Sequence, residues 1–216
     1  MAKKKIGILG SGIVAQVLGS GFLNHGHEVM IGTRDAGKLS EWKAKGNEQA
    51  RVGSMEEAAG FGDILVLAVK GTVAESLVKP LASLLAGKTV IDATNPIADT
   101  APENGVMKFM TDLNRSLMEK LQALAPSANF VKAFSCVGSH LMVSPNLPGG
   151  KPTMFIAGNS EKARKEVSDI LVMFGWEVED LGMAEAARAI EPLSMLWCIP
   201  GFIRNDWTHA FKVLRA

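Results

Sequence analysis

The chain has 216 residues, of which 47% are hydrophobic and 21% charged, and its formal net charge is +1. This length suits one large domain or a domain with a small appendage, and the near-neutral charge argues against nucleic acid or an anionic membrane as a partner. No apolar run approaches the roughly 20 residues that span a bilayer, and the two cysteines, Cys136 and Cys198, are too far apart to indicate a disulfide framework or a metal motif. We therefore expect a cytoplasmic protein without a bound metal.

Short β-branched runs alternate with helical patterns along the first two thirds of the chain. The expected elements are strands at 5–9, 28–32, 50–53, 63–69, 88–94 and 129–134, with helices at 13–24, 39–45 and 73–85. Because the strands are almost continuously apolar, the pattern predicts a doubly wound, mostly parallel α/β sheet of the Rossmann type, covered on both faces. Residues 95–111 are rich in Pro, Asn and Asp, and we expect them to form a loop at the sheet edge where such folds bind ligands.

The composition changes after Cys136. A loop with several Pro and Gly residues, 142–152, precedes a second strand, helix and strand at 153–182, and helical sequence follows from Ala184. We expect a dinucleotide-binding domain, residues 1–136, and a small C-terminal α/β domain, residues 137–216, that serves substrate binding and dimerisation.

The segment "ILGSGIVAQ" has the spacing of a dinucleotide-binding turn. Gly10 permits the tight turn, Gly12 lets the backbone approach a pyrophosphate, and Ala15 is small enough for the helix to pack on the strand. The N–H groups near Ile13 and Val14 open the helix and are expected to face the phosphates. The motif follows the first strand and begins a helix within a βαβ unit, which is the context that gives it weight.

Thr33 and Arg34 stand where an NAD-binding chain places an acidic residue. Such an acid accepts hydrogen bonds from the ribose 2′-hydroxyl and would repel a 2′-phosphate. Arg34 can instead pair with that phosphate or stack on adenine, while Thr33 donates its hydroxyl and Lys38 lies close by. The sequence therefore predicts NADP(H) as the cofactor, with Asp35 capping the following helix.

The chemistry is constrained by what the sequence lacks. There is no tyrosine in the chain, which excludes the dehydrogenases that use a Tyr-Lys proton donor. About eighty residues after the sixth strand are too few for the large helical substrate domain of the hydroxyacid and pyrroline reductases. We expect a small-molecule redox substrate that accepts a hydride without a dedicated acid, and a second redox ring fits that description.

Longer segments are more specific than the glycine motif. They are "ILGSGIVAQVLGSGFLNHGHEVMIGTRD", "DILVLAVK", "VIDATNP", "VKAFSCVG", "MFIAGNSEKARKEVSDILVMFGWEVEDLG" and "AARAIEPLSMLW". In these segments, which extend over almost the whole chain, the sequence resembles the NADP oxidoreductases that depend on the deazaflavin coenzyme F-420, whose fold is similar to the cytosolic domain of the STEAP metalloreductases. The resemblance implies hydride transfer between NADPH and a deazaflavin stacked in an interdomain cleft.

The resemblance also assigns residues to the site by position. It implies 2′-phosphate contacts at Thr33, Arg34 and Lys38, a phosphate loop at Ser11, Gly12, Ile13 and Val14, a further cofactor loop at Ala68, Val69 and Lys70, and nicotinamide backbone contacts at Ser135, Cys136, Val137 and Gly138. From the residues alone, Asn95 and Pro96 at the end of the fifth strand are placed to meet a ribose or the nicotinamide.

Several alternatives stay open. Residues 95–111 do not match the reductases of known substrate, so a flavin, a ferric chelate or another small molecule can replace the deazaflavin as acceptor. Reduction of a small carbonyl or imine would need a proton donor such as His140, which is equally a solvated loop histidine. Cys136 is interpreted as a small buried thiol rather than a nucleophile. An NADP(H)-binding sensor without chemistry is the remaining possibility, and a homodimer is expected in every case.

Overall fold

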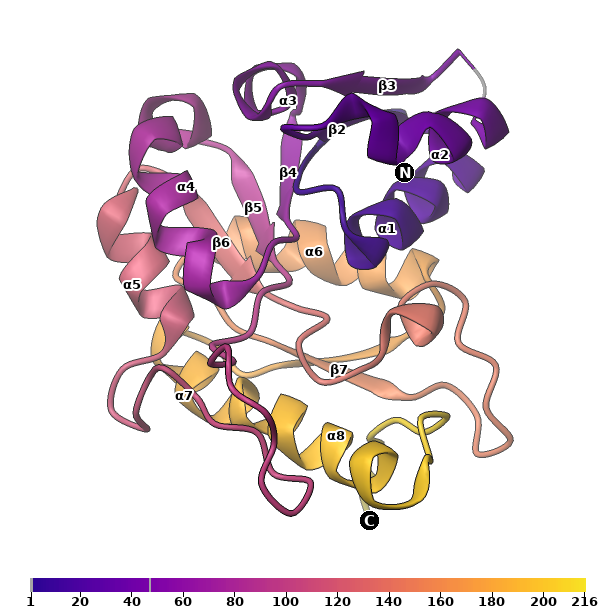
Figure 1. Ribbon diagram of the computed structural model, residues 1–216, viewed down its shortest axis with the longest axis vertical. Helices are drawn as coiled ribbons and strands as arrows, with labels where there is room; N and C mark the ends of the chain where they lie inside the picture. The colour runs from indigo at the N-terminus through magenta and orange to yellow at the C-terminus, as the bar shows by residue number, and fades with distance from the viewer. Residues whose placement is uncertain (1, 47) are drawn as a thin grey trace.

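Six parallel strands form the central sheet of the molecule, in the order β3-β2-β1-β4-β5-β6 (Figure 1). The computed structural model describes residues 2–46 and 48–216. The strands are β1 (Lys5–Leu9), β2 (Glu28–Gly32), β3 (Ala50–Gly53), β4 (Ile64–Leu67), β5 (Thr89–Asp92) and β6 (Asn129–Lys132). This strand order is that of two mononucleotide-binding halves joined at β1 and β4. The predicted doubly wound α/β fold is therefore confirmed.

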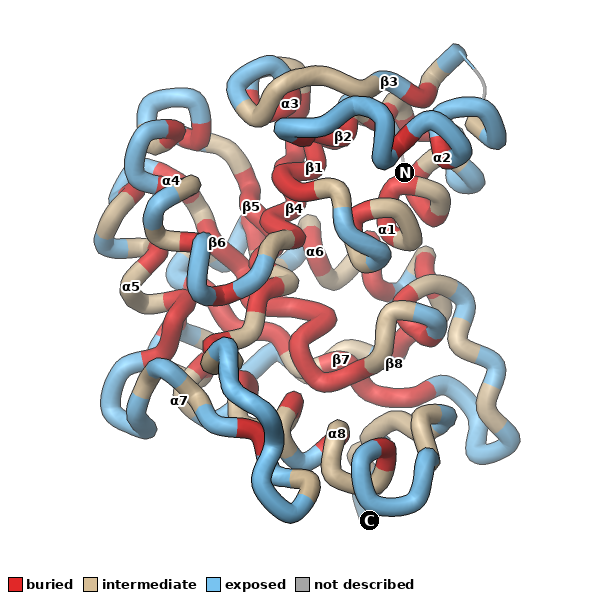
Figure 2. The backbone as a smooth tube through the Cα atoms, in the orientation of Figure 1, coloured by how far each residue is buried: buried red, intermediate tan, exposed pale blue. Residues whose placement is uncertain are grey.

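Helices cover both faces of the sheet because side chains alternate between the faces along each strand. In β4, Ile64 and Val66 join one hydrophobic cluster while Leu65 and Leu67 join the other. The helices of the sheet domain are α1 (Ile13–Asn24), α2 (Ser40–Lys45), α3 (Met55–Phe61), α4 (Gly71–Leu85) and α5 (Leu117–Leu124). Figure 2 shows the central strands buried between these helices, while most of the edge strand β3 is not buried.

Two of these helices, α3 and α5, are absent from the sequence-based prediction. Each begins at a serine whose side chain accepts from a backbone N–H three residues on, while the glutamate at that position bonds back to the serine. The pairs are Ser54 with Glu57 and Ser116 with Glu119. This capping box is a sequence signal that would have located both helices.

The C-terminal part adds a second, smaller sheet. The strands β7 (Thr153–Ile156) and β8 (Glu177–Asp180) pair in parallel, and α6 (Glu161–Met173) connects them and packs against β5 and β6. The helices α7 (Ala187–Ile190) and α8 (Pro192–Arg204) complete the chain's regular structure. One hydrophobic cluster runs from β1 through α1 to α6 and β7, so the core is continuous across the predicted boundary between residues 136 and 137, and that boundary stays a prediction.

Within residues 2–46 and 48–216, none of the helices combines the length and the apolar character that crossing a membrane requires.

Candidate functional site

A groove of about 560 Å³ lies at the carboxyl ends of β1 and β4, and we call it the edge groove. This is the sheet edge at which open α/β folds bind ligands. Its wall consists of Ser11, Gly12, Ile13, Val14, Arg34, Lys38, Ala68, Val69, Lys70, Val73 and Ala93. All of these except Val73 and Ala93 are residues that the sequence predicts to contact the cofactor, and the structure brings them together.

Gly10 and Gly12 shape the floor of the edge groove in different ways. Gly10 has a φ of +125°, and a Cβ at this position would lie 2.2 Å from the carbonyl oxygen of Ala68. A side chain here would therefore clash with backbone. A Cβ at Gly12 would meet no atom within 4 Å, so the space beside this glycine is open to a ligand.

Two hydroxyl groups meet where the turns after β1 and β2 come together. The Thr33 Oγ1 is 3.0 Å from the Ser11 Oγ and also accepts from the Asp35 N–H. The Asp35 carboxylate accepts from the Gly37 N–H and caps the short 3₁₀ helix Ala36–Leu39, as the sequence predicts. Arg34 and Lys38 are exposed in the groove wall. A ligand in the groove would therefore meet two cations, while the Asp35 carboxylate is already hydrogen-bonded to the Gly37 N–H.

A second hollow of about 330 Å³ adjoins the edge groove, and we call it the loop pocket. Its wall consists of Val69, Lys70, Gly71, Ala93, Asn95, Ile97 and Asp99. Lys70, which borders both hollows, lies with its Nζ 2.9 Å from the Asp99 Oδ1, and Thr72 donates to the Asp99 Oδ2. The hydrogen bond from Lys70 is the main cause that lowers the pKa of Asp99 below its ordinary value.

The loop that follows β5, residues 95–116, is irregular, as the composition of residues 95–111 predicts, and single bridges close part of it into a hairpin. Single bridges join Ile97 to Phe109 and Glu103 to Val106, and Gly105 at the tip has a φ of +81°. The tip reaches α8, since a Cβ on Gly105 would lie 2.9 Å from the Ile203 side chain. One wall of the loop pocket is thus connected to the C-terminal helices.

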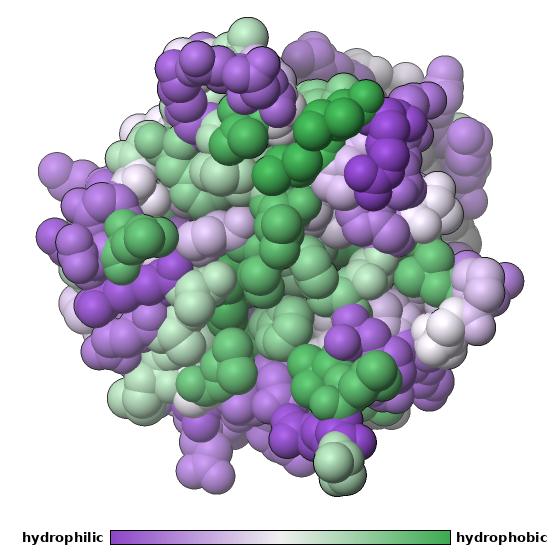
Figure 3. All heavy atoms as spheres, turned by 90° about the horizontal axis from the view of Figure 1, so that it is seen from below, coloured by the Kyte–Doolittle hydropathy of each residue, from purple (hydrophilic) through white to green (hydrophobic). Residues whose placement is uncertain are grey.

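The loop and α8 together carry exposed apolar side chains. They are Val106, Met110, Leu113, Leu196, Phe202 and Ile203. Figure 3 views the molecule from the side on which α8 lies and shows hydrophobic residues running across this face between hydrophilic borders. A patch of this kind is typical of a surface that another molecule covers.

The segment after β6, residues 133–137, is buried, and side chains from other parts of the fold hydrogen-bond to its backbone. Phe134 has a φ of +61° although it is not a glycine, and strained backbone of this kind concentrates at functional sites. Asn95 donates to the Ser135 carbonyl at 2.9 Å, which joins the ends of β5 and β6. Burial raises the pKa of the Cys136 thiol to about 12, so the thiol stays protonated and is no nucleophile at neutral pH. Pro96 and Val137 are buried as well.

Gly138 and His140 lie beside an aromatic cluster of the C-terminal helices. A Cβ on Gly138 would lie 2.6 Å from the Trp197 ring and 3.0 Å from the His140 Cε1. Trp197 in turn stacks on His209, with 5.0 Å between the ring centroids. His140 is exposed, and its role as a proton donor stays a prediction.

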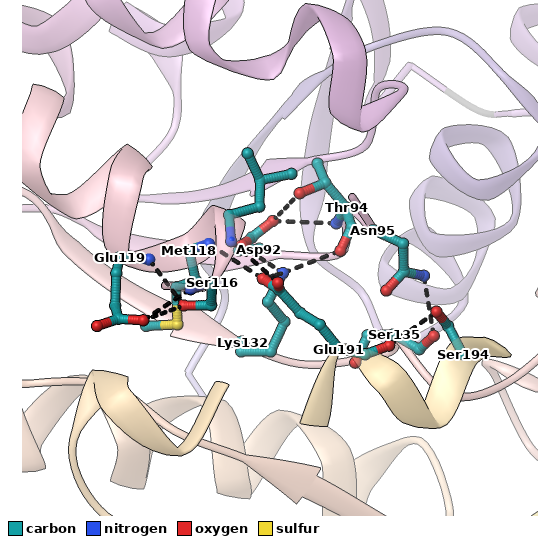
Figure 4. A network of polar contacts seen from close by, with 11 residues as sticks. Asp92, Thr94, Asn95, Ser116, Met118, Glu119, Lys132, Ser135, Glu191 and Ser194 are labelled. Atoms are coloured by element: carbon teal, nitrogen blue, oxygen red, sulfur yellow. Dashed lines mark hydrogen bonds and ion pairs between the residues drawn. The ribbon is translucent and has the colours of Figure 1, made fainter. Parts of the chain in front are cut away.

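Three charged side chains come together in the buried interior near the ends of the loop after β5, and the sequence-based prediction does not include them (Figure 4). The Lys132 Nζ is 2.7 Å from the Asp92 Oδ2 and 3.0 Å from the Glu191 Oε1, and all three side chains are at most 2% exposed. We call these three residues the ion triad. Desolvation opposes the charged ammonium, but Asp92 and Glu191 outweigh it and raise the pKa of Lys132 above its ordinary value. A lysine and an aspartate at paired positions of adjacent apolar strands are the signal in the sequence.

Comparisons with known proteins agree with this geometry. Residues 5–96 match the family described as NADP oxidoreductase coenzyme F420-dependent. The chain is 28% identical to the F420-dependent NADP reductase of Methanocaldococcus jannaschii over 79% of its own length and 80% of that protein. It is 29% identical to the metalloreductase STEAP3 of Rattus norvegicus over 91% of its own length, but it spans only 38% of that longer protein.

A solved structure is similar over the full chain. The crystal structure of a protein described as an F420-dependent NADP reductase from Arthrobacter sp. FB24 superposes with a TM-score of 0.91 at 28% identity, covering 98% of this chain and 100% of the other. The resemblance that the sequence shows to these families is therefore confirmed.

Proposed function

We propose, from this kinship with the coenzyme F420-dependent NADP oxidoreductases, that the protein transfers a hydride between NADP(H) and a redox-active ring such as a deazaflavin or a flavin. The observation that carries the proposal is the edge groove, in which Arg34 and Lys38 lie at one end and the loop pocket adjoins the other. The groove offers cations to a phosphate and then opens beside Asn95, where a second substrate has room.

The chain's own residues fit an NADP dinucleotide. The open space at Gly12 admits a pyrophosphate, and the unpaired N–H groups at the start of α1 face it with the positive end of the helix dipole. Arg34 and Lys38 would bind the 2′-phosphate by charge-assisted hydrogen bonds, which are about twice as strong as neutral ones. The neighbouring Ser11 and Thr33 hydroxyls supply further donors.

At the other end, the chain orients the reacting ring instead of supplying a nucleophile. NADPH, when bound, supplies the hydride from its nicotinamide. Asn95 and the backbone of Ser135 to Gly138 would hold that ring at the ends of β5 and β6, and Cys136 stays a neutral thiol behind them. We propose that residues 1–136 bind the cofactor and that residues 137–216 complete the site of the second substrate.

The test is anaerobic oxidation of NADPH, followed by the cofactor's absorbance, with deazaflavin, FMN, FAD and a ferric chelate as acceptors. We expect turnover with a ring acceptor, and in Arg34→Ala a rise of about 10- to 100-fold in the KM for NADPH, with the KM for NADH little changed. Lys43→Ala, which removes an exposed cation of α2 outside the groove, is the matched control. Binding of NADPH without turnover of any acceptor would contradict the proposal and favour a sensor.

A second candidate is the reduction of a small carbonyl or imine, and the position of His140 favours it. The exposed ring of His140 lies against Gly138, within the segment proposed to hold the nicotinamide, and a carbonyl needs a proton as well as a hydride. Turnover of carbonyl or imine substrates that falls in His140→Ala, without turnover of flavins, would establish this candidate in place of the first.

We also propose that the apolar face of α8 and the loop joins two copies of the chain. Phe202 and Ile203 are 44% and 63% exposed, and a symmetric pair of such faces is the commonest form of association. Light scattering should give the mass of a dimer for the wild type and of a monomer for Phe202→Glu/Ile203→Glu. A wild-type monomer at micromolar concentration would contradict this proposal.

A further inference from the structure

The ion triad holds Thr94, the residue that precedes the loop bordering the loop pocket. The Lys132 Nζ donates to the Thr94 carbonyl at 2.9 Å, and the Asp92 Oδ1 accepts from both the backbone N–H and the hydroxyl of Thr94. Asn95, the first residue of the loop and part of the pocket wall, follows directly. The direction in which the chain leaves β5 is therefore fixed by buried charges.

The same triad holds the other end of the loop. The two carboxylate oxygens of Glu191 accept from the N–H groups of Leu117 and Met118, at 2.9 and 3.0 Å. These are the first residues of α5, where N–H groups have no partner within the helix. Because Glu191 also pairs with Lys132, a single buried contact connects the two ends of residues 95–116 with the start of α8 (Figure 4).

Burying three charged side chains costs free energy, so stability alone does not explain why they lie at this position. Removing charges from water costs several kcal/mol per ion, and a buried ion pair is often no more stabilising than the apolar side chains that would replace it. The triad instead fixes the path of the chain at both ends of the loop, because each of its charges bonds a backbone group at one of those ends. Of the residues that line the edge groove, by contrast, only Ala93 belongs to the connection that the triad holds, and the others follow β1, β2 and β4.

We propose that Lys132 and Glu191 are positioning residues for the second substrate, a planar redox ring, because they fix the loop that forms the wall of its pocket. This inference rests on the proposed function. We propose that residues of the β1–α1 and β2 connections bind the cofactor's phosphates and adenine end, while only Asn95 of the loop meets its nicotinamide. A loosened loop should therefore weaken the use of the acceptor far more than the binding of NADPH.

Glu191→Gln tests the proposal. The amide keeps the size of the side chain and one acceptor oxygen but removes the charge that pairs with Lys132. The expected result is a rise of about tenfold or more in the KM for the ring acceptor, with the dissociation constant of NADPH within about twofold of the wild-type value. Trypsin should also cleave the loop faster, after Lys108 and Arg115, at temperatures where the rest of the protein is folded.

Glu119→Gln is the matched control, because Glu119 also bonds the start of α5, through Ser116, but its ion pair is with Arg188 and not with Lys132. It should leave both constants within about twofold. Should Glu191→Gln fail to fold, Glu191→Asp replaces it: the shorter carboxylate keeps its charge but cannot span Lys132 and both N–H groups, and the same rise in acceptor KM is expected.

The outcomes separate this inference from the proposed function. If the wild type turns over a ring acceptor but the variants change its KM by less than twofold, or change the KM for NADPH equally, Lys132 and Glu191 have only a structural role and the inference is wrong. If the wild type turns over no acceptor, the proposed function itself fails.

Discussion

The edge groove and the loop pocket adjoin each other, but they are assembled in different ways. The groove comes from the turns that follow β1, β2 and β4, and its hydroxyl contact joins Thr33 and Ser11, which are 22 residues apart. The wall of the loop pocket is fixed by Lys132 and Glu191, whose backbone partners lie 38 and up to 74 residues away. The acceptor half thus depends on buried contacts between residues farther apart in the sequence than those of this hydroxyl pair.

The family model covers mainly the cofactor half. The matched residues, 5–96, contain the wall of the edge groove and end at the second residue of the loop. The similarity to the solved reductase structure extends over 98% of the chain and so includes the acceptor half as well. The following predictions test whether the two halves are independent.

The largest effect is expected from Lys132→Met, because it leaves two carboxylates buried without a cation. Removing one partner of a buried ion pair costs about 3–5 kcal/mol, and urea unfolding should show a loss of that size in the free energy of unfolding. Lys43→Met, which changes an exposed residue, should cost less than about 0.5 kcal/mol. A loss below about 1 kcal/mol for Lys132→Met would mean that the triad does not hold the acceptor half together.

Gly10→Ala and Gly12→Ala should separate folding from binding within the cofactor half. The first variant combines a positive φ with a Cβ 2.2 Å from the Ala68 oxygen, and we expect it to lose about 2–4 kcal/mol of stability together with NADPH binding. The second meets no neighbour, so its stability should change by less than about 0.5 kcal/mol. Its added methyl group should still weaken NADPH binding strongly, which calorimetry would measure. Full NADPH affinity in Gly12→Ala would contradict the position of the pyrophosphate.

The same difference explains what the sequence could predict. The alternation of strands and helices, the glycine turn, the role of Asp35 and the cations at positions 34 and 38 follow from local spacing, and the structure brings the residues of the turn and the cations together. The contact of Glu191 with α5 depends on how two distant helices pack, which no periodicity encodes. The helices α3 and α5 could have been predicted from the sequence, because their capping boxes are local signals.

Acid should weaken the contact between α5 and α7 through Glu119. The Arg188 guanidinium lowers the pKa of Glu119 from 4.5 to about 2. A carboxyl whose pKa is depressed in the folded state stabilises it above its unfolded pKa, and this contribution disappears as the pH falls through the folded value. The stability difference between wild type and Glu119→Gln should therefore be about 2 kcal/mol near neutral pH and vanish between about pH 5 and pH 2. Denaturant titrations across this range measure it, and a difference independent of pH would contradict the assignment.

The smallest effect is expected where the two halves meet at the surface, at the pair of Lys70 and Asp99. Their side chains are 76% and 61% exposed, so Asp99→Asn should not shift the temperature of unfolding measurably. It does remove a negative charge beside a groove that we propose to bind an anionic cofactor, and it frees Lys70 to face that ligand. NADPH affinity should therefore rise by about twofold at low ionic strength, and the gain should disappear near 1 M salt, where screening acts over about 3 Å. A gain that persists in high salt would show instead that Asp99 restrains the loop, and the two halves would then be coupled at this contact.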